Sequence, residues 1–521
     1  MKRIVTRLSI VIFFLTAVGC SVNPVTGKNE LSLVSNSQEI AIGEQNYRPS
    51  QQAQGGIYYI DPNLQSYIKE VGNKLAAVSD RPDLPYEFVV LNNSVPNAWA
   101  LPGGKIAINR GLLSHLDNEA ELAAVLGHEI VHAAARHSAA QMTRGTFIGA
   151  GAQILGLTLA DSNYSQLANT AIQVGAAAWM ARYGRSAELE SDYYGMEYMS
   201  KAGYDPYGAV RLQQTFVKLS EGRQTDFISG LFASHPPSQE RVEANTEKAK
   251  SLPKGELYVS RYQSKIAQLK KDAPAYKAEE EAIKALQQKN PKLALTYLDK
   301  AIKIQPKDGY FWELRGHAWK MQKDPNNAEK AFTTAIDKNP NLFSHYLARG
   351  VLRYEQKKQA LARQDLEHSN QLLPTQAASF ILGELSLKDN DQAAALKYYQ
   401  SAATSGGDLG QQAMSKITML ELPKSPSKYV LSKAYLSEDG YLMIAVKNQA
   451  NIAVTAVTLK LDKMVNGYPV GATANFTLPG ALEPGQQQAI KTTFGPFKTA
   501  DEAGQYRTEV IAAQAVGSLN Q

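Results

Sequence analysis

The sequence predicts a chain of several domains: a mainly α-helical domain with a small β element, an α-solenoid of helical repeats, and an all-β, sandwich-like domain. Three observations support this prediction. A length of 521 residues corresponds to three or four domains at about 150 residues each. Three prolines recur at intervals of 34 residues. Past Pro423, short alternating runs replace the helical patterns.

The composition excludes several classes of protein. With 44% hydrophobic and 20% charged residues, the chain can bury ordinary cores and is not a disordered polymer. The net charge of +6, from 55 basic and 49 acidic residues, is too small to indicate a nucleic-acid partner, and we expect none. The single cysteine, Cys20, excludes an intramolecular disulfide framework and any cysteine-rich metal site.

The first 19 residues are predicted to be a lipoprotein signal peptide. Three basic residues precede an uncharged, mostly apolar run that is too short to span a bilayer. Cys20 follows this run and resembles the acylated cysteine of bacterial lipoproteins, although Ala17 stands where leucine is usual. By the same resemblance, Ser21 favours the outer membrane. We therefore expect a periplasmic protein that the acylated Cys20 tethers to the outer membrane, with residues 20–60 as the tether segment. The alternative is an ordinary signal peptide cleaved near a chance cysteine.

Residues 275–420 are predicted to form tetratricopeptide repeats, preceded by a charged helical connector at 254–274. Pro306, Pro340 and Pro374 are each 34 residues apart, which is the length of a tetratricopeptide unit, and each closes a predicted helix pair. Generic helical hairpins are the alternative. Solenoid grooves present extended concave surfaces, so we expect these repeats to hold a client or an assembly machine.

Residues 424–521 are predicted to form the β-sandwich-like domain. The turn signal Asp439-Gly440 precedes an apolar run, and residues 452–461 partly alternate. Strands of this length at short spacing favour a small sandwich. The segment shows no catalytic motif, and its role stays open.

The chemistry is carried by the motif His128-Glu129-x-x-His132. Asn118 with Glu121 three residues later signals the start of the helix that contains it. The two histidines are separated by one helical turn and project from one face, where two imidazoles can bind one zinc ion. Glu129 is placed beside the open coordination position, where it can take a proton from the metal-bound water. A surface histidine pair is the alternative, but the helix is otherwise rich in apolar residues.

A catalytic zinc ion needs a third protein ligand, and Glu188 is the best candidate. Asp192 lies one turn further and can accept the N–H of a liganding histidine, which fixes its tautomer. Glu190 faces elsewhere and is the weaker candidate. A solvated acidic helix face is the alternative interpretation of these residues.

Two further residues are candidates near the reaction. His235 precedes two prolines in a restricted loop, so it can donate to the oxyanion or occupy the open zinc position at rest; a loop histidine without a role is the alternative. Arg241 is a weaker candidate for the same donor role or for a contact with a ligand. His137, five residues after His132, is expected to point away from the metal as a surface or capping residue. The remaining histidines considered have no metal-like spacing: His115, His317, His345 and His368.

At these residues the chain resembles the M48 family of zinc metallopeptidases, in its periplasmic lipoprotein branch with tetratricopeptide repeats. The resemblance covers roughly residues 23–245. It rests on Asn23–Lys28, Asn97–Ala100, Pro102–Gly104, His128–His132, Glu188 with Asp192, Ala202–Pro206 and Ser234–Pro237.

The resemblance implies a zincin-like metallopeptidase domain over residues 61–253 with one Zn²⁺ per chain. His128, His132 and Glu188 are then the metal ligands, and Glu129 is the base. It also implies an endopeptidase that cleaves misfolded or misassembled outer-membrane proteins. A strand carrying Gly103, Gly104 and Ile106 is expected either to pair with an extended substrate backbone at the cleft edge or to be a core strand. The alternative function is a periplasmic chaperone or scaffold that uses the repeats and has a latent zinc site.

Overall fold

The computed structural model describes residues 20–144, 183–221, 235–404, 406–470, 474–497 and 499–517. The expected signal peptide at residues 1–19 therefore lies outside the described residues. The chain divides into two compact units, residues 1–345 and 346–521, and each is described by itself. In the described part of the chain, no helix is long and apolar enough to cross a membrane.

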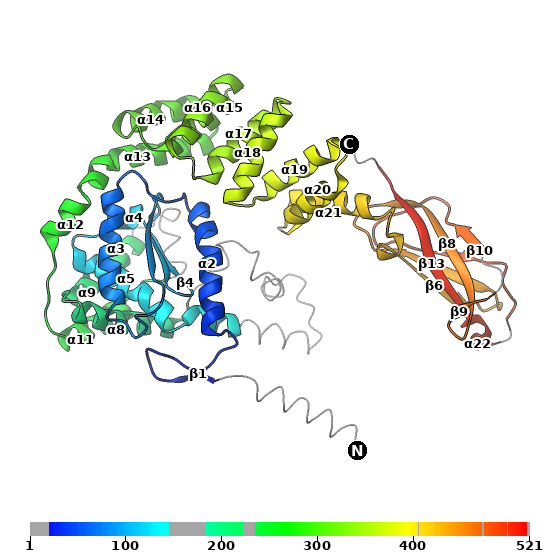
Figure 1. Ribbon diagram of the computed structural model, residues 1–521, viewed down its shortest axis with the longest axis horizontal. Helices are drawn as coiled ribbons and strands as arrows, with labels where there is room; N and C mark the ends of the chain where they lie inside the picture. Colours follow the sequence, from blue (N-terminus) through cyan, green and yellow to red (C-terminus); the bar gives the residue numbers. More distant parts are fainter. Residues whose placement is uncertain are drawn as a thin grey trace, which may run out of the picture. The chain divides into compact units, whose positions relative to one another are not determined.

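The first unit is built around a three-stranded sheet (Figure 1). Its strands are β3 (Glu87–Leu91), β4 (Ala98–Leu101) and β5 (Lys105–Asn109). The central strand is β5, which pairs with β3 in parallel and with β4 in antiparallel orientation. Alternate residues face opposite sides, as the pleat requires. One face packs against α3 (Pro62–Ala76) and α5 (Glu119–Ala134), and the other contacts Tyr47 of α2 (Asn36–Ala53).

The central position of β5 decides between the two interpretations of this strand in favour of a core strand. The strand that follows Gly103 and Gly104 is hydrogen-bonded on both sides, and Ile106 is fully buried. Ile106 therefore lies in the core of the sheet, where its backbone cannot pair with a substrate, and Gly103 and Gly104 form the turn before the strand. Both glycines have positive φ, and a Cβ at Gly103 would lie 2.8 Å from the Cα of Ile40. They are glycines because the turn and its close packing require it.

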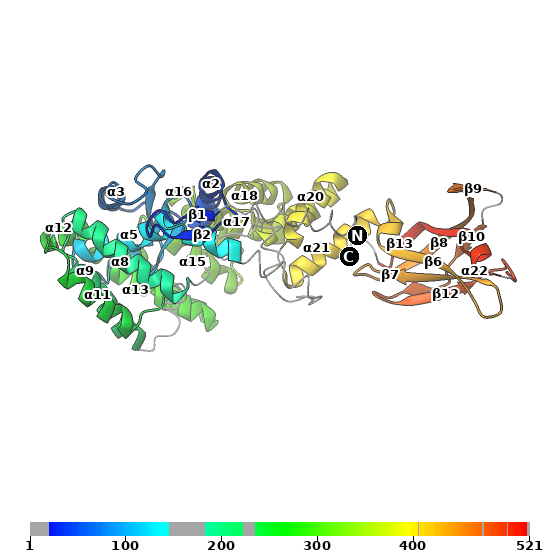
Figure 2. The same cartoon turned by 90° about the horizontal axis from the view of Figure 1, so that it is seen from below.

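Four packed helices surround the candidate residues, and three of them carry most of these residues. Every residue of α5 is buried, and its first turn is closed by Asn118, whose Oδ1 accepts the Glu121 N–H at 3.0 Å. Against α5 pack α8 (Arg185–Lys201) and α9 (Tyr207–Glu221). α11 (Gln239–Lys250) packs on both of them (Figure 2).

Two of the helix pairs belong to the first unit. They are α13 (Ala267–Gln287) with α14 (Pro291–Ile304) and α15 (Gly309–Met321) with α16 (Pro325–Lys338). The segment expected as a connector is α12 (Val259–Lys265) and the start of α13. It is helical as predicted, but it is also part of the core, because Tyr262 is fully buried and donates to the Leu113 carbonyl at 2.7 Å.

Buried polar contacts join these repeats to the sheet. Arg110, directly after β5, donates to Glu279 of α13 at 3.0 Å, and its guanidinium lies 3.3 Å from the centre of the Tyr276 ring. Asn92, directly after β3, donates to Asp308 at 3.0 Å. The first repeats and the sheet therefore form one body, and part of the solenoid surface is covered by the chain itself.

The repeat pattern continues through the second unit. Its helices are α17 (Phe343–Glu355), which begins at the boundary, α18 (Gln359–Leu372), α19 (Gln376–Lys388), α20 (Gln392–Ala403) and α21 (Asp408–Glu421). The three predicted prolines stand two residues after α14, α16 and α18. In each of three repeats, a glycine of the first helix packs against a large side chain of the second helix. Gly316 lies against Phe332, Gly350 against Leu366 and Gly383 against Tyr399. The prediction of a helical solenoid is confirmed.

The C-terminal segment is a sandwich of two antiparallel sheets. One consists of β6 (Val430–Leu436), β7 (Leu442–Asn448) and β12 (Gln487–Lys491). The other is organised around β8 (Val454–Val465), which pairs with β9 (Tyr468–Pro469), β10 (Ala474–Thr477), β11 (Ala481–Leu482) and β13 (Tyr506–Ala515). Apolar side chains of both sheets share one core, among them Ile444 and Leu459. The predicted all-β sandwich-like domain is confirmed.

Candidate metal centre

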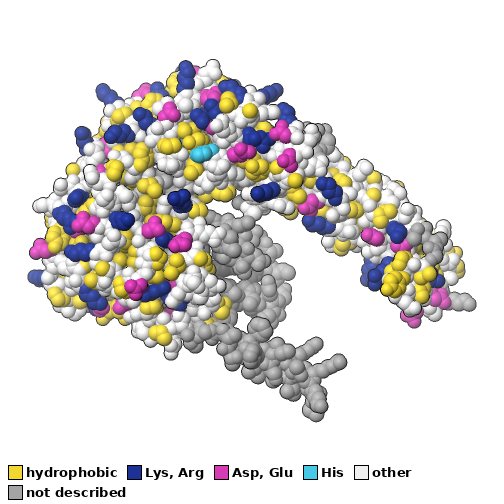
Figure 3. Space-filling model, in the orientation of Figure 1, with side chains coloured by type: hydrophobic (Ala, Val, Ile, Leu, Met, Phe, Trp, Pro, Cys, Tyr) yellow, Lys and Arg dark blue, Asp and Glu magenta, His cyan; other side chains and the backbone are white. Residues whose placement is uncertain are grey.

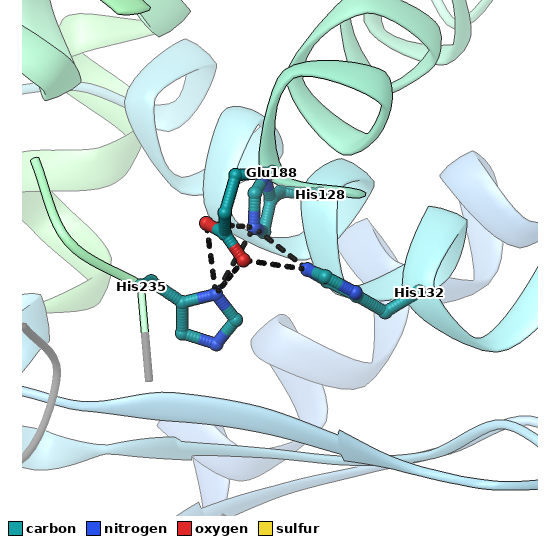
Figure 4. Close-up of side chains that lie close together, drawn as sticks. All are labelled: His128, His132, Glu188 and His235. Carbon is teal, nitrogen blue, oxygen red and sulfur yellow. Dashed lines mark hydrogen bonds and ion pairs between the residues drawn. The ribbon is translucent and has the colours of Figure 1, made fainter. Parts of the chain in front are cut away.

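Four buried side chains converge at one point of the first unit (Figure 4). They are His128 and His132 of α5, Glu188 of α8, and His235, which precedes α11. One potential ligand atom from each lies within 4.8 Å of the others. The structure therefore brings together all three predicted ligands and His235, although 107 residues separate His128 from His235.

The spacing of these atoms fits one metal ion. Two ligand atoms bound tetrahedrally to zinc at about 2.0–2.1 Å lie about 3.3 Å apart. The Nε2 atoms of His128 and His132 are 3.0 Å apart, and each is 3.5 Å from a carboxylate oxygen of Glu188. Two imidazoles and one carboxylate are also a donor set that suits a divalent transition metal. The residues present thus fit the metal that the sequence analysis predicts.

Close helix packing sets this geometry. A Cβ at Gly127 would lie 3.1 Å from the Gly195 carbonyl oxygen, and a Cβ at Gly195 would lie 3.0 Å from the His128 nitrogen. The two backbones can touch only because both residues are glycines. This contact lies one residue before His128 on α5 and one turn after Asp192 on α8. It therefore brings the histidines of α5 close to Glu188 of α8.

Asp192 and Arg241 organise the far side of His128. The Nδ1 atom of His128 lies 2.9 Å from Asp192 Oδ1, so Nδ1–H is the donor when Nε2 faces a metal. Arg241 donates to both oxygens of Asp192 at 2.7 Å and lies 3.0 Å from Glu188. Because its guanidinium already contacts these carboxylates and the Pro236 carbonyl, this arrangement favours a contact with the ligand residues over the oxyanion role.

Burial and charge shift the pKa values of these groups in opposite directions. Burial lowers the pKa of His128, but its contacts with Asp192 and Glu188 outweigh burial and raise the pKa to about 9. Burial raises the pKa of Asp192, but Arg241 and His128 bring it down to about 2. The neighbouring histidines likewise hold the pKa of Glu188 far below its usual value despite burial. The two carboxylates thus stay ionised, as metal binding requires.

Glu129 has the environment expected of a base. Its carboxylate is buried, and Oε2 has no hydrogen-bond partner among the described residues. Oε1 lies 3.6 Å from His235 Nε2. Burial raises the pKa of this carboxyl. A buried oxygen without a partner is costly in a native structure and indicates a group that bonds to a water molecule or substrate at the site.

His235 occupies the remaining side of the cluster. Its Nδ1 is 3.0 Å from Glu188 Oε1 and 3.3 Å from His128 Nε2. These are the separations expected of a fourth ligand. The adjoining cavity, which Ala98, His128 and Glu129 help to line, has a volume of only about 30 Å³. Such a cavity holds one or two water molecules and not a peptide.

His137 is not among the possible ligands, as predicted, but the prediction that it is a surface or capping residue is wrong. It is buried, with Nδ1 at 2.9 Å from His132 Nδ1 and Nε2 at 3.1 Å from Glu190 Oε1. α5 ends at Ala134, and Arg136 adopts a left-handed conformation with φ of 61°. His137 therefore turns back toward His132 instead of continuing around the helix. Glu190 faces away from the cluster, as expected.

The other histidines lie away from the cluster, but one of them is not an ordinary exposed position. His345 is fully buried and its Nδ1 lies 2.5 Å from Glu313. Sequence reasoning also missed Tyr183, whose ring stacks on His132 at 3.9 Å between centroids. No local pattern marks Tyr183, because its contact depends on the packing of α8 beside α5.

Comparison with known proteins agrees with this geometry. Residues 62–249 match the model of Peptidase family M48. The chain is 34% identical over 181 residues to the mitochondrial metalloendopeptidase OMA1 of Arabidopsis thaliana, covering 35% of each protein. It is 32% identical over 199 residues to a putative beta-barrel assembly-enhancing protease of Vibrio cholerae, covering 37% of this chain and 40% of that protein.

A third relative is the beta-barrel assembly-enhancing protease of Escherichia coli K12. It is 29% identical over 228 residues, which are 42% of this chain and 45% of that protein. The chain thus spans less than half the length of each of these three relatives. Among solved structures, the first TPR domain of human RPAP3 matches 23% of this chain and 97% of that domain at 22% identity, with a TM-score of 0.22.

Proposed function

Residues 62–249 form a peptidase family M48 domain, and from this premise we propose that the whole chain is a zinc-dependent endopeptidase of the bacterial cell envelope. His128, His132 and Glu188 hold the metal in this proposal, with one Zn²⁺ per chain. The observation that carries it is the unpartnered carboxylate oxygen of Glu129, buried beside three metal-binding side chains. A purely structural site needs four ligands and no base.

The roles of the residues follow from their positions. A bound zinc ion supplies Lewis-acid polarisation of the scissile carbonyl and makes an attacking water more acidic. Glu129 accepts the proton of that water at its free Oε2 and then delivers it to the leaving amine. Asp192 holds the ring of His128 by its Nδ1–H, and Arg241 keeps Asp192 ionised. His235, once moved away from Glu188, has an N–H that can donate to the developing oxyanion.

The substrate we propose is an extended segment of a misfolded or misassembled protein of the outer membrane. β4 supports this proposal: within the described sheet its outer side carries no strand, and Ala98 on it lines the cavity beside Glu129. The four residues of β4 are buried, so its edge must first be uncovered; an unpaired edge then pairs with an extended backbone, which gives affinity with little sequence preference. The names of the two beta-barrel assembly-enhancing relatives agree with a substrate of this class.

Location and partners belong to the same proposal. We expect acylation of Cys20 to tether the chain to the outer membrane from the periplasmic side. Because the first repeats contact the sheet, the later repeats in residues 346–420 are the ones we expect to bind a client or the assembly machinery. On the face shown in Figure 3, basic and acidic side chains are interspersed.

The variant Cys20→Ser tests the proposed lipid anchor. It should move the protein from the membrane fraction to the soluble fraction.

A second function is favoured by two observations. The cavity of about 30 Å³ and the position of His235 close the site to a peptide in this arrangement. A chaperone or scaffold with a latent zinc site would have these properties. A regulated protease at rest would have them too, so the variant His235→Ala separates the two: release of proteolysis supports the protease.

The first experiment combines zinc content with cleavage of an unfolded β-rich protein by the full chain and by Glu129→Gln. The substitution keeps the proposed ligands and removes the base. One zinc in both proteins with cleavage only by the wild type supports the peptidase. Zinc in both without cleavage by wild type or His235→Ala favours the scaffold. Absence of zinc from both overturns the metal assignment.

A further inference from the structure

A chain of buried and partly buried polar contacts leads from His132 to the N-terminal segment. His132 Nδ1 lies 2.9 Å from His137 Nδ1, and His137 Nε2 lies 3.1 Å from Glu190 Oε1. The same oxygen of Glu190 is 3.4 Å from the Asn23 side-chain nitrogen. His137 and Asn23 are buried. The mechanism described above gives none of His137, Glu190 and Asn23 a role.

We propose that His137 and Glu190 are positioning residues that fix the ring of His132 for metal binding. The inference rests on the proposed metal site. If His132 binds metal through Nε2, its Nδ1 carries the hydrogen and must donate. His137 Nδ1 is the acceptor at that place, so the hydrogen of His137 lies on Nε2, which faces the carboxylate of Glu190. Each donor meets an acceptor, and only one tautomer of each ring satisfies this arrangement.

The arrangement differs from the one on His128. There a carboxylate, Asp192, accepts directly from the liganding ring at 2.9 Å. On His132 a neutral imidazole stands between the ring and the carboxylate. The hydrogen bond is still directional, and the negative charge of Glu190 polarises it through His137. Loss of such an outer contact typically weakens metal binding about 10–100-fold.

The N-terminal hairpin holds this pair in place. β1 (Cys20–Val22) and β2 (Asn29–Leu31) form the hairpin, and Asn23 accepts the backbone N–H of Val25 within its turn. Arg136, which has the left-handed conformation that turns His137 inward, donates to Ser21 Oγ at 2.6 Å and to Glu39 at 3.0 Å. Arg136 also donates to the Val34 carbonyl at 2.5 Å. The segment directly after Cys20 therefore supports both the turn and the acceptor carboxylate.

The test measures zinc affinity of the full chain by competition with a chromogenic chelator. His137→Leu keeps the volume and removes the acceptor, so we expect about 10-fold to 100-fold weaker binding. His137→Asn restores an acceptor near Nδ1, and its zinc affinity should lie closer to that of the wild type than to that of His137→Leu. His368→Leu, in the second unit, is the matched control and should bind zinc as the wild type does.

A second readout excludes a merely structural effect. With Co²⁺ in place of zinc, the visible absorption spectrum of His137→Leu should shift, because the orientation of a ligand ring has changed. Glu190→Gln, which keeps size and burial, should weaken binding less than His137→Leu, and the two changes together should be less than additive. The melting temperature of each metal-free variant shows whether the fold is intact.

The outcomes separate the two proposals. If the wild type binds no zinc, the proposed metal site fails and with it the premise of this inference. If the wild type and His137→Leu bind zinc equally and give the same cobalt spectrum, the metal site stands and the positioning role is overturned. If His137→Leu does not fold, Glu190→Leu decides, because it removes the acceptor of His137 Nε2–H: unchanged zinc affinity there overturns the role.

Discussion

Replacing Arg241 by methionine tests how the charges of the metal centre are balanced. Arg241 is buried and makes three short contacts with carboxylates, two at 2.7 Å with Asp192 and one at 3.0 Å with Glu188. Methionine fills the space of the aliphatic stem but leaves both anions buried without this cation. Removing one partner of a buried ion pair costs about 3–5 kcal/mol, because the remaining charge stays uncompensated.

This free energy converts into a melting temperature. An unfolding entropy of about 2.1 cal/mol/K per residue over the 345 residues of the first unit amounts to about 0.7 kcal/mol/K. Metal-free Arg241→Met should therefore melt about 4–7 °C below the wild type by scanning calorimetry. Saturating zinc should shrink the difference, because the ion itself compensates Glu188.

The control is Arg241→Lys. It retains the positive charge but cannot contact Asp192 and Glu188 in the forked geometry, so its melting temperature should fall between the other two. If metal-free Arg241→Met melts within 1 °C of the wild type, the buried carboxylates do not depend on Arg241, and the reasoning about the charge balance is refuted.

Three further predictions concern stability. Burial raises the pKa of Glu279 to about 7 despite Arg110; because this exceeds the unfolded value near 4.5, the wild type loses stability as pH rises from 4.5 to 7. Between pH 4.5 and 7, the free energy of unfolding of Glu279→Gln should therefore rise by on the order of 3 kcal/mol relative to that of the wild type, as measured by urea unfolding. If the stability of Glu279→Gln depends on pH in the same way as that of the control Glu281→Gln, this prediction is contradicted. Gly316→Ala should lower the free energy of unfolding by about 1–3 kcal/mol, because its Cβ would lie 2.4 Å from the Phe332 ring. The control Gly406→Ala, whose Cβ would meet nothing within 4 Å, should unfold at the same urea concentration as the wild type. Equal urea midpoints for the two variants would refute the packing argument. A chelator should lower the stability of zinc-loaded wild type by about 2.7 kcal/mol when free zinc is 100 times its dissociation constant, and Glu188→Ala should show a much smaller shift; an equal shift would remove Glu188 from the site.

Local patterns were enough to predict much of the fold. The spacing of His128 and His132 predicts their common face because a helix repeats every 3.6 residues. The same period places Glu188 and Asp192 on one face of α8. The proline interval predicts the solenoid because each repeat is one local helix pair that packs on its neighbour.

His137 shows where local reasoning fails. The spacing of five residues from His132 predicts the wrong direction for the His137 side chain, because that prediction requires α5 to continue past Ala134. The helix ends because Arg136 takes a left-handed conformation, and that conformation is held by Ser21 and Glu39. Neither partner is near Arg136 in the sequence, so no pattern around residue 137 contains the signal.

The strand after Gly104 shows the same limit for sheets. Its sequence predicts a strand, but its place between β3 and β4 depends on pairing with residues 87–91 and 98–101. An edge strand and a central strand can have the same sequence pattern when both faces are buried.

The sequence by itself determined the order of the domains, the helix with its two histidines and base, and the candidate third ligand, because these depend on periods and spacings within one element. Only the tertiary structure decided that His235 faces His128 and Glu188, that Arg241 contacts two buried carboxylates, and that His137 contacts His132. These contacts join residues that are far apart in the chain, and their energies depend on burial, which exists only after the helices have packed.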